Sequence, residues 1–343
     1  MSKNLLQEAN PYGTRIATLE NDGRTLYLYL SPPEDLPGDT RAVWVRNLLP
    51  APAETDHEAM RAGQAPLLRQ AACAHPEGLP LPENEELDLV WFSEGTGVVL
   101  YRNGEAEALI PPWSGADGLQ GYAREAVAQD VGTLPLPPDS QQGFHDRLRE
   151  NLEFWTSRSQ KSHWESFRDR LIAHYEASYG PHKTYYAVTD RDYPPLAVAE
   201  FEVEDGFMLA TIGMSNQNMP GVEGNVAGDA PNTRMRAEIL SYTANKTEWL
   251  PGVLGRMAIF PWLAGAFFDH GHTYESGVDS ANSNFVLTRE FDRLHLSAPA
   301  EMVLDERYPV NWLLAAPIPQ EYFMVAKVRG IEHVLEKLYS SDD

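Results

Sequence analysis

Cysteine is almost absent from this sequence of 343 residues, and Cys73 is the only one. A single thiol cannot build a disulfide framework or a thiolate metal cluster within one chain. The first ten residues hold one lysine and no apolar run, so they lack the basic start and hydrophobic stretch of a secretion signal. We therefore expect a cytoplasmic protein that works in a reducing compartment.

Long hydrophobic runs are also missing. The most apolar segment, residues 249–268, contains Arg256 and the two prolines Pro251 and Pro261. Its uninterrupted apolar length is well below the roughly 20 residues that a membrane-spanning helix needs. We interpret this segment as a buried helix and expect no membrane partner.

Basic residues are scarce, since 27 lysines and arginines stand against 50 aspartates and glutamates and give a formal net charge of -23. Both halves of the chain are acidic. Such a field repels nucleic acids and anionic lipids, and it accelerates encounter with basic proteins. The sequence thus argues against a nucleic-acid partner. Two interpretations stay open, simple solubility and attraction of a basic protein partner.

Apolar residues are plentiful enough for sizeable cores, and a chain of this length usually forms two domains. The proline-rich stretch 134–140 cannot continue a helix and favours an extended conformation. We therefore expect a small α+β domain of unassigned function over 1–133, a linker over 134–140 and a second domain over 141–343. The fold class predicted for both domains is α+β, with a mixed or antiparallel twisted sheet and flanking helices.

The first domain shows a clear hairpin signal. Asn21-Asp22-Gly23 separates the alternating runs 14–19 and 24–30, and an Asp-Gly turn between such runs is typical of a β-hairpin. Further elements are expected as strands over 41–48, 87–92 and 97–101 and as helices over 54–72 and 118–129.

The second domain is expected to begin with helices, because apolar residues from Phe144 to Trp155 and from Phe167 to Tyr175 recur every three or four positions. Gly180-Pro181 ends the second helix. A polar loop is expected over 215–232. Strands are predicted over 185–189, 196–203, 207–213, 235–243, 285–287, 301–304 and 312–317, and helices over 249–268 and 321–339.

One cluster has metal-ligand chemistry. Asp269, His270 and His272 lie at the end of the predicted apolar helix, and a carboxylate with two imidazoles suits zinc or a similar ion. Beside the two imidazoles a further protein ligand would have to come from elsewhere, such as Glu275 or Asp279, and the chain has no HExxH or Cys/His spacing. A structural role is therefore our first interpretation and a metal-dependent hydrolase the alternative. We expect no resident cofactor.

Five residues are candidates for contacting a partner. Glu223 and Asp229 lie in the polar loop and could bind a partner's lysine or arginine, or simply be solvated. Arg236 and Glu238 alternate on one face of a predicted strand, where buried charges need partners. For these two we expect a structural ion pair first and a binding hot spot second. Asn216 follows Gly213-Met214-Ser215 at the start of the loop.

Six short signatures between Trp164 and Tyr339 occur in the order found in the Suppressor of Fused domain, and this part of the chain resembles that family. No such resemblance is found for residues 1–134. Asn216 occupies a position at which the animal members carry an acidic residue. The signatures are His174–Pro181, Ala210–Ser215, Arg236–Ile239, Trp249–Pro251, the segment from Asp269 to Leu287, and Leu314–Glu321.

The resemblance implies a mixed α/β domain with twisted sheets flanked by helices, which binds protein segments and catalyses no reaction. For bacterial members it implies an immunity protein that binds and neutralises a toxin encoded by a neighbouring gene. A regulatory adaptor for a transcription or signalling protein is the alternative. Animal members hold a peptide between this domain and one that follows it. Here the additional domain comes first, so we do not expect that binding mode. The sequence leaves the oligomeric state open.

Overall fold

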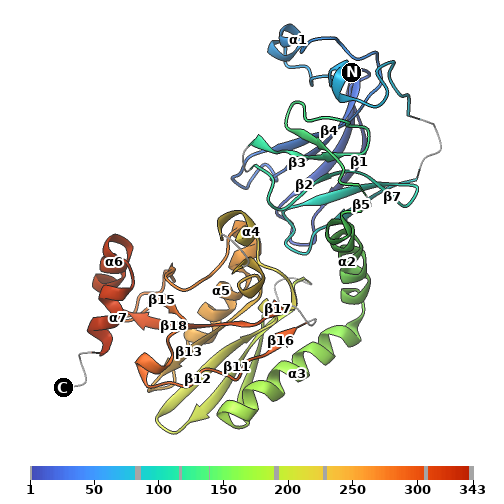
Figure 1. The fold of residues 1–343 in the computed structure, drawn as a ribbon. Helices are drawn as coiled ribbons and strands as arrows, with labels where there is room; N and C mark the ends of the chain where they lie inside the picture. Colours follow the sequence, from blue (N-terminus) through green and yellow to red (C-terminus); the bar gives the residue numbers. More distant parts are fainter. Residues whose placement is uncertain are drawn as a thin grey trace. The chain divides into compact units, whose positions relative to one another are not determined.

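The protein, seen in a computed structural model, has the α+β fold predicted from the sequence (Figure 1). The structure describes residues 2–81, 86–115, 118–138, 140–188, 193–226, 230–304 and 308–339. The chain divides into two compact units, Met1–Ser157 and Arg158–Asp343. Among the described residues, no helix combines the length and apolar character needed to cross a bilayer.

The first unit begins with an antiparallel sheet of four strands, β1 (Lys3–Ala9), β2 (Ile16–Asn21), β3 (Thr25–Ser31) and β4 (Arg41–Asn47), in the order β1-β2-β3-β4. The predicted hairpin is confirmed by the pairing of β2 with β3. Gly23 has a φ of 84°, which suits a residue without a Cβ. The Asp22 carboxylate accepts hydrogen bonds of 2.8 Å from the backbone N–H of both Arg24 and Thr25, so side chains of the turn itself fix its shape.

A second sheet of the first unit has the order β5-β6-β7-β8-β9. Its members pair antiparallel except β8 and β9, which are parallel. Val98, Leu100 and Ile110 from this sheet share one hydrophobic core with Leu28 and Leu30 of the first sheet. The strands are β5 (Leu87–Trp91), β6 (Val98–Arg102), β7 (Glu105–Ile110), β8 (Gly121–Ala123) and β9 (Thr133–Pro135).

Two helix predictions for this unit are wrong. The expected helix over 54–72 is only the short α1 (His57–Arg61), followed by a 3-10 turn at Gln70–Ala72, because Gly63 adopts a φ of 79° and Pro66 follows. The expected helix over 118–129 is replaced by β8. Gly121 packs so tightly on β7 that an added Cβ would lie 2.2 Å from the Leu109 carbonyl oxygen. Tertiary packing therefore overrides local propensity here.

Helix α2 (Gln142–Arg158) follows β9. Its Leu148 packs with Phe92, Val99 and Leu109, on the opposite face of β6 and β7 from the shared core. Residues of α2 up to Ser157 belong to the first compact unit, although the sequence predicts a linker before them. The role of residues 134–140 as a linker stays a prediction.

Cys73 is buried in the first unit, where it forms an isolated β-bridge with Ala126. Its Sγ lies 3.9 Å from the amide nitrogen of Asn47. Burial raises the pKa of the thiol above its ordinary value. The thiol is therefore less nucleophilic at neutral pH than an exposed one.

The second unit is built on a sheet of seven strands in the order β10-β11-β12-β13-β18-β15-β14. Strands β13 and β18 are parallel, and the other neighbouring pairs are antiparallel. Two short strands, β16 (Val303–Leu304) and β17 (Tyr308–Pro309), pair separately. The sheet strands are β10 (His182–Val188), β11 (Leu196–Val203), β12 (Gly206–Ile212), β13 (Ala237–Thr243), β14 (Thr273–Glu275), β15 (Asn284–Thr288) and β18 (Asn311–Ile318).

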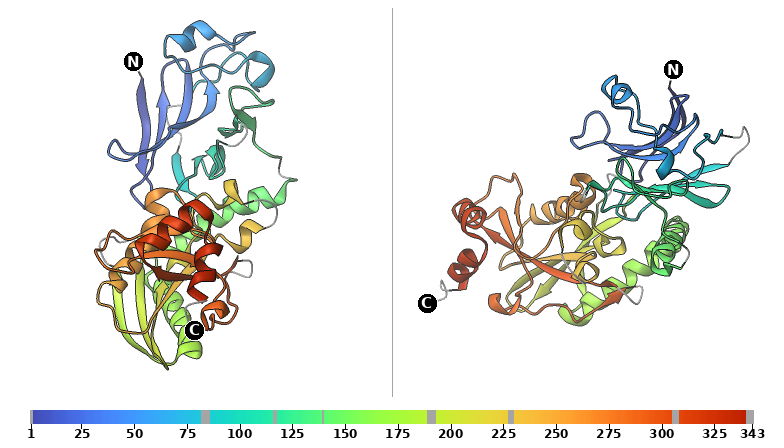
Figure 2. Two further views of the ribbon diagram at one scale, coloured as in Figure 1. Left: turned by 90° about the vertical axis from the view of Figure 1, so that its left-hand side faces the viewer. Right: turned by 45° about the horizontal axis from the view of Figure 1, so that its top comes forward.

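Two helices pack against this sheet. Phe167 and Leu171 of α3 (Lys161–Tyr179) share a core with Ala199 and Phe201 of β11. Helix α5 (Leu250–Ala264) also contacts β11, and Leu196, which points away from the α3 core, lies beside it. Helix α5 ends four residues before the predicted end at 268, because Gly265 takes a φ of 63°. Near β15 lie α6 (Gln320–Arg329) and α7 (Glu332–Tyr339) (Figures 1 and 2).

Candidate functional site

The loop that follows β12 is held in place by one buried carboxyl group, that of Glu238 on β13. Its Oε1 accepts hydrogen bonds from the backbone N–H of Gly213 (3.0 Å), from the backbone N–H of Ser215 (2.9 Å) and from the Ser215 hydroxyl (2.7 Å). Its Oε2 accepts a 2.6 Å hydrogen bond from the Thr211 hydroxyl. Glu238 is fully buried, so these four donors provide the polar environment that water would otherwise supply.

Burial raises the pKa of Glu238 from 4.5 to about 7, because desolvation penalises the carboxylate more than the four hydrogen bonds stabilise it. At neutral pH the protonated form of this carboxyl group is therefore much more populated than in a solvent-exposed glutamate. Its placement below the loop makes it a positioning residue for the loop backbone.

Gly213 begins this loop in a conformation that favours glycine. Its φ is 114°, and an added Cβ would lie 2.4 Å from the Pro195 carbonyl oxygen. The Gln217 amide donates a 2.8 Å hydrogen bond to the Gly213 carbonyl, and the Trp262 indole donates one of 3.0 Å to the Asn218 carbonyl. The loop is therefore fixed from both β13 and α5.

Asn216 lies at the centre of this rigid loop and is 1% exposed. Its Oδ1 is 3.1 Å from His163 Nε2, and since a carboxamide oxygen only accepts, the imidazole donates here. Its backbone carbonyl accepts a 2.8 Å hydrogen bond from the Arg158 guanidinium. Its Nδ2 is buried without a hydrogen-bond acceptor. Asn216 therefore carries a buried, unsatisfied donor next to the site.

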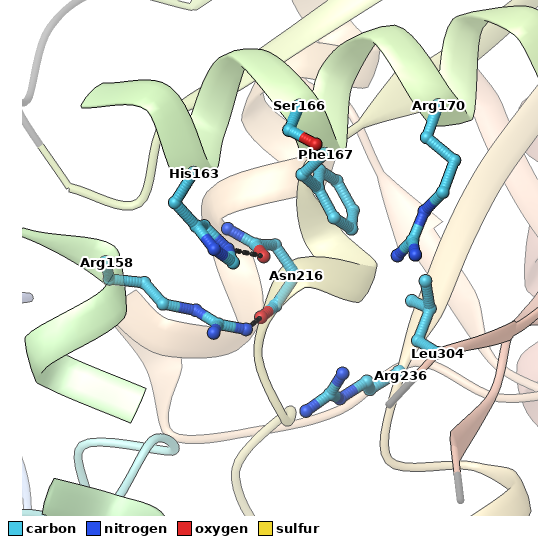
Figure 3. A pocket seen from close by; sticks show the side chains of 8 residues that line it. All are labelled: Arg158, His163, Ser166, Phe167, Arg170, Asn216, Arg236 and Leu304. Carbon is cyan, nitrogen blue, oxygen red and sulfur yellow. Dashed lines mark hydrogen bonds between the residues drawn. The ribbon is translucent and has the colours of Figure 1, made fainter. Parts of the chain in front are cut away.

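Around Asn216 the second unit has a polar pocket with a volume of about 140 Å³. Figure 3 shows three guanidinium groups directed toward the space beside Asn216. Within the described parts of the chain, no aspartate or glutamate lines this pocket. The basic pocket is lined by Arg158, His163, Ser166, Phe167, Arg170, Asn216, Arg236 and Leu304.

The ion pair expected between Arg236 and Glu238 is not formed, because each side chain has other partners. The Arg236 Nε donates a 3.0 Å hydrogen bond to the Asn218 side chain, and its guanidinium lies 4.5 Å from the ring centroid of Tyr308. Glu238 is bound to Thr211 and the loop, as described above. Arg236 therefore faces the basic pocket while Glu238 supports the backbone beneath it.

A larger groove lies between the edge strand β10 and helix α5, with a volume of about 760 Å³. Polar groups at this groove include Glu248 and Arg256. A space of this size accommodates several side chains of a bound segment. Its apolar lining includes Val188, Leu196, Pro251, Ile259 and Leu263.

The three candidate metal ligands each contact other protein groups rather than converging on one site. The Asp269 carboxylate pairs with Arg289 and, at 2.8 Å, with Arg234. His270 is 3.6 Å from Glu332, and His272 is 3.2 Å from the Phe267 carbonyl oxygen. Over the residues that the structure describes, no group of three or more His, Cys, Asp or Glu side chains is placed to hold a metal ion.

The structure brings together some of the predicted contact residues. Asn216 and Arg236 line the basic pocket, and Glu238 lies beneath it. Glu223 is half-buried in α4 (Val222–Asn225) and does not line the pocket, and Asp229 lies outside the described residues. Sequence reasoning missed the contribution of α3. The spacing of His163, Ser166, Phe167 and Arg170 places them on one helical face and was the available signal.

These features define the second unit as a mixed α/β domain with a rigid basic pocket and a separate apolar groove. The family model of Suppressor of fused protein (SUFU) matches residues 192–343. This part of the chain is therefore similar to the Suppressor of fused family, as its sequence signatures predicted. The signature His174–Pro181 lies before the matched range.

Two solved structures have a distant similarity to this chain. A SUFU homologue from Neisseria gonorrhoeae is 14% identical, covers 52% of this chain and 92% of its own length, and has a TM-score of 0.39. A Sufu-Fu complex is 12% identical, with 50% and 82% coverage and a TM-score of 0.36. Comparison with curated proteins gave no match.

Proposed function

We propose that the second unit binds another polypeptide and that the protein acts through this binding rather than by catalysis. The match of residues 192–343 to the Suppressor of fused family model is the observation that supports this role. The sequence resemblance to that family implies the same kind of activity.

We further propose that the partner is a basic toxin, which the protein meets in the cytoplasm and neutralises as an immunity protein. The net charge of -23 supports a basic partner, because opposite charges increase the association rate. This role also agrees with the resemblance to bacterial members of the family.

The groove beside β10 is the surface that we assign to the partner. Strand β10 is the outermost strand on its side of the sheet, so its outer backbone groups have no strand partner among the described residues. An extended segment could pair with this edge while its apolar side chains enter the groove beside Ile259 and Leu263. Backbone pairing would supply affinity, and the groove would select the side chains.

Capture of the partner from the native cell tests the role. The full chain is immobilised, bound polypeptides are identified by mass, and binding is then measured with the purified partner. Ile259→Glu places a charge in the groove and should abolish capture. Val328→Glu is the matched control, because Val328 is 78% exposed on α6 and does not line the groove.

Association kinetics test the charge of the partner. The association rate should fall about tenfold or more between 50 and 500 mM NaCl, since the screening length of the attraction shortens from about 14 Å to about 4 Å over this range. A salt-independent rate would contradict a basic partner. Recovery of a transcription or signalling protein would favour the adaptor role, and the absence of any captured polypeptide would contradict protein binding itself.

A further inference from the structure

We propose that the basic pocket is a binding site for a compact oxyanion, a phosphate or carboxylate group. Arg158, Arg170, Arg236 and Asn216 form the recognition surface, and His163 positions Asn216. This assignment is independent of the proposed protein-binding role.

The charge of the residues that line the pocket favours an anionic ligand. The chain has nearly twice as many acidic as basic residues, yet three arginines line one pocket that has no acidic side chain among its described lining residues. Arg170 makes no hydrogen bond or ion pair with any described residue. An oxyanion in the pocket would supply a partner for Arg170.

Two of the guanidinium groups are held in a fixed orientation by other residues. The Arg236 guanidinium is oriented by Asn218 and Tyr308, and Arg158 is oriented by the Asn216 carbonyl. Guanidinium groups whose orientation is already fixed lose less entropy when they bind a carboxylate or phosphate. The loop beneath them is held by Glu238, so the recognition surface exists before a ligand arrives.

The side chain of Asn216 has a hydrogen-bond donor without a partner. Asn216 lines the pocket, and its buried Nδ2 has no acceptor. An unpaired buried donor carries a penalty of about 1 to 3 kcal/mol. A ligand oxygen that reached this group would remove the penalty.

Size limits the ligand class. A volume of about 140 Å³ is small beside the roughly 300 to 1,000 Å³ of typical sites for larger organic ligands. One phosphate or carboxylate group fits with a few waters, whereas a whole nucleotide does not. The pocket therefore recognises the charged end of a ligand.

Anion titration of the full chain tests the assignment without any protein partner. Thermal unfolding and calorimetry are measured with sodium phosphate, with sodium acetate, and with sodium chloride at matched ionic strength. At least one oxyanion should raise the unfolding temperature more than chloride does. A response to phosphate alone identifies a phosphate site, and a response to acetate identifies a carboxylate site.

Variants on α3 assign the response to the pocket. Arg170→Gln should weaken oxyanion binding about tenfold or more, as expected for the loss of one charge-assisted hydrogen bond. Ser166→Glu places a carboxylate at the pocket and should also weaken oxyanion binding. Ser166 and Arg170 are both exposed, so these substitutions should leave the fold intact. Arg168→Gln is the matched control, because Arg168 pairs with Asp169 on the same helix and does not line the pocket.

Two results would overturn the assignment. One is an unfolding temperature that responds to phosphate and acetate no more than to chloride. The other is equal oxyanion affinity in the Arg170→Gln and Arg168→Gln proteins.

Discussion

The Ser215 hydroxyl donates a 2.7 Å hydrogen bond to the carboxyl group of Glu238, which lies 23 residues later in the chain. Ser215 ends one of the family signatures seen in the sequence, and Glu238 lies within the next. The two signatures therefore form one structural element, a loop fixed on a buried acid. This contact holds the loop that carries Asn216, one of the residues lining the basic pocket.

Replacement of Glu238 should change how stability depends on pH. The folded pKa of about 7 is above the ordinary value of 4.5, so the folded state binds more protons between these values. The contribution of Glu238 to the free energy of unfolding is fully present below about pH 4.5 and is lost as the pH rises through 7. Relative to Glu238→Gln, the wild type should lose about 2 kcal/mol of unfolding free energy between pH 5 and 8, measured by urea denaturation. Parallel pH profiles would contradict the raised pKa.

Gly213→Ala should destabilise the second unit. The φ of 114° and the 2.4 Å approach of an added Cβ to the Pro195 carbonyl oxygen both oppose any side chain. We expect a loss of about 2 to 4 kcal/mol in the unfolding free energy. Gly224→Ala is the control, because no atom of the described residues lies within 4 Å of its added Cβ and its φ is ordinary. Equal stability of the two variants would show that the loop tolerates a side chain.

Asn216→Asp should close the basic pocket to anions. The new carboxylate would lie 3.1 Å from the His163 ring and among three arginines, where it would act as an internal counter-ion. Phosphate and acetate should then stabilise the protein no more than chloride at matched ionic strength, in the same unfolding assay. A retained oxyanion response would mean that the anions bind elsewhere.

Asp269→Asn should lower stability through loss of ion pairs. Asp269 is buried and contacts Arg234 and Arg289, whose side chains are 34% and 37% exposed, so we discount the effect for solvent screening. The expected loss is about 1 to 3 kcal/mol in denaturant unfolding, and a chelator should not change the wild type. A chelator that lowered the unfolding temperature would instead support a metal role for His270 and His272.

Much of the second unit could be predicted from sequence because its strands are buried and bounded by turn residues. The run 196–203 coincides with β11, and β12, β13 and β18 lie within one or two residues of their predicted bounds. In the first unit, the sequence predicts Gly121 to lie within a helix, whereas it lies in strand β8. Its contact with the Leu109 carbonyl comes from strand pairing, which local patterns do not show.

The candidate site was only partly predictable. Asn216, Arg236 and Glu238 stood out as polar residues in otherwise apolar signatures, and the structure brings them together. The sequence could not show that Glu238 accepts hydrogen bonds from backbone N–H groups instead of pairing with Arg236, because these contacts depend on the path of the loop. It also could not show that Arg170 lies across from Asn216, since α3 and the loop are far apart in the chain.

Cys73 offers a chemical reporter of local opening. As the chain's only thiol, buried in the first unit, it should be shielded from alkylating reagents until that unit opens. The alkylation rate of the intact chain therefore measures how often the first unit opens. Opening events confined to the second unit leave this signal unchanged, so a partner that slows alkylation must act on the first unit.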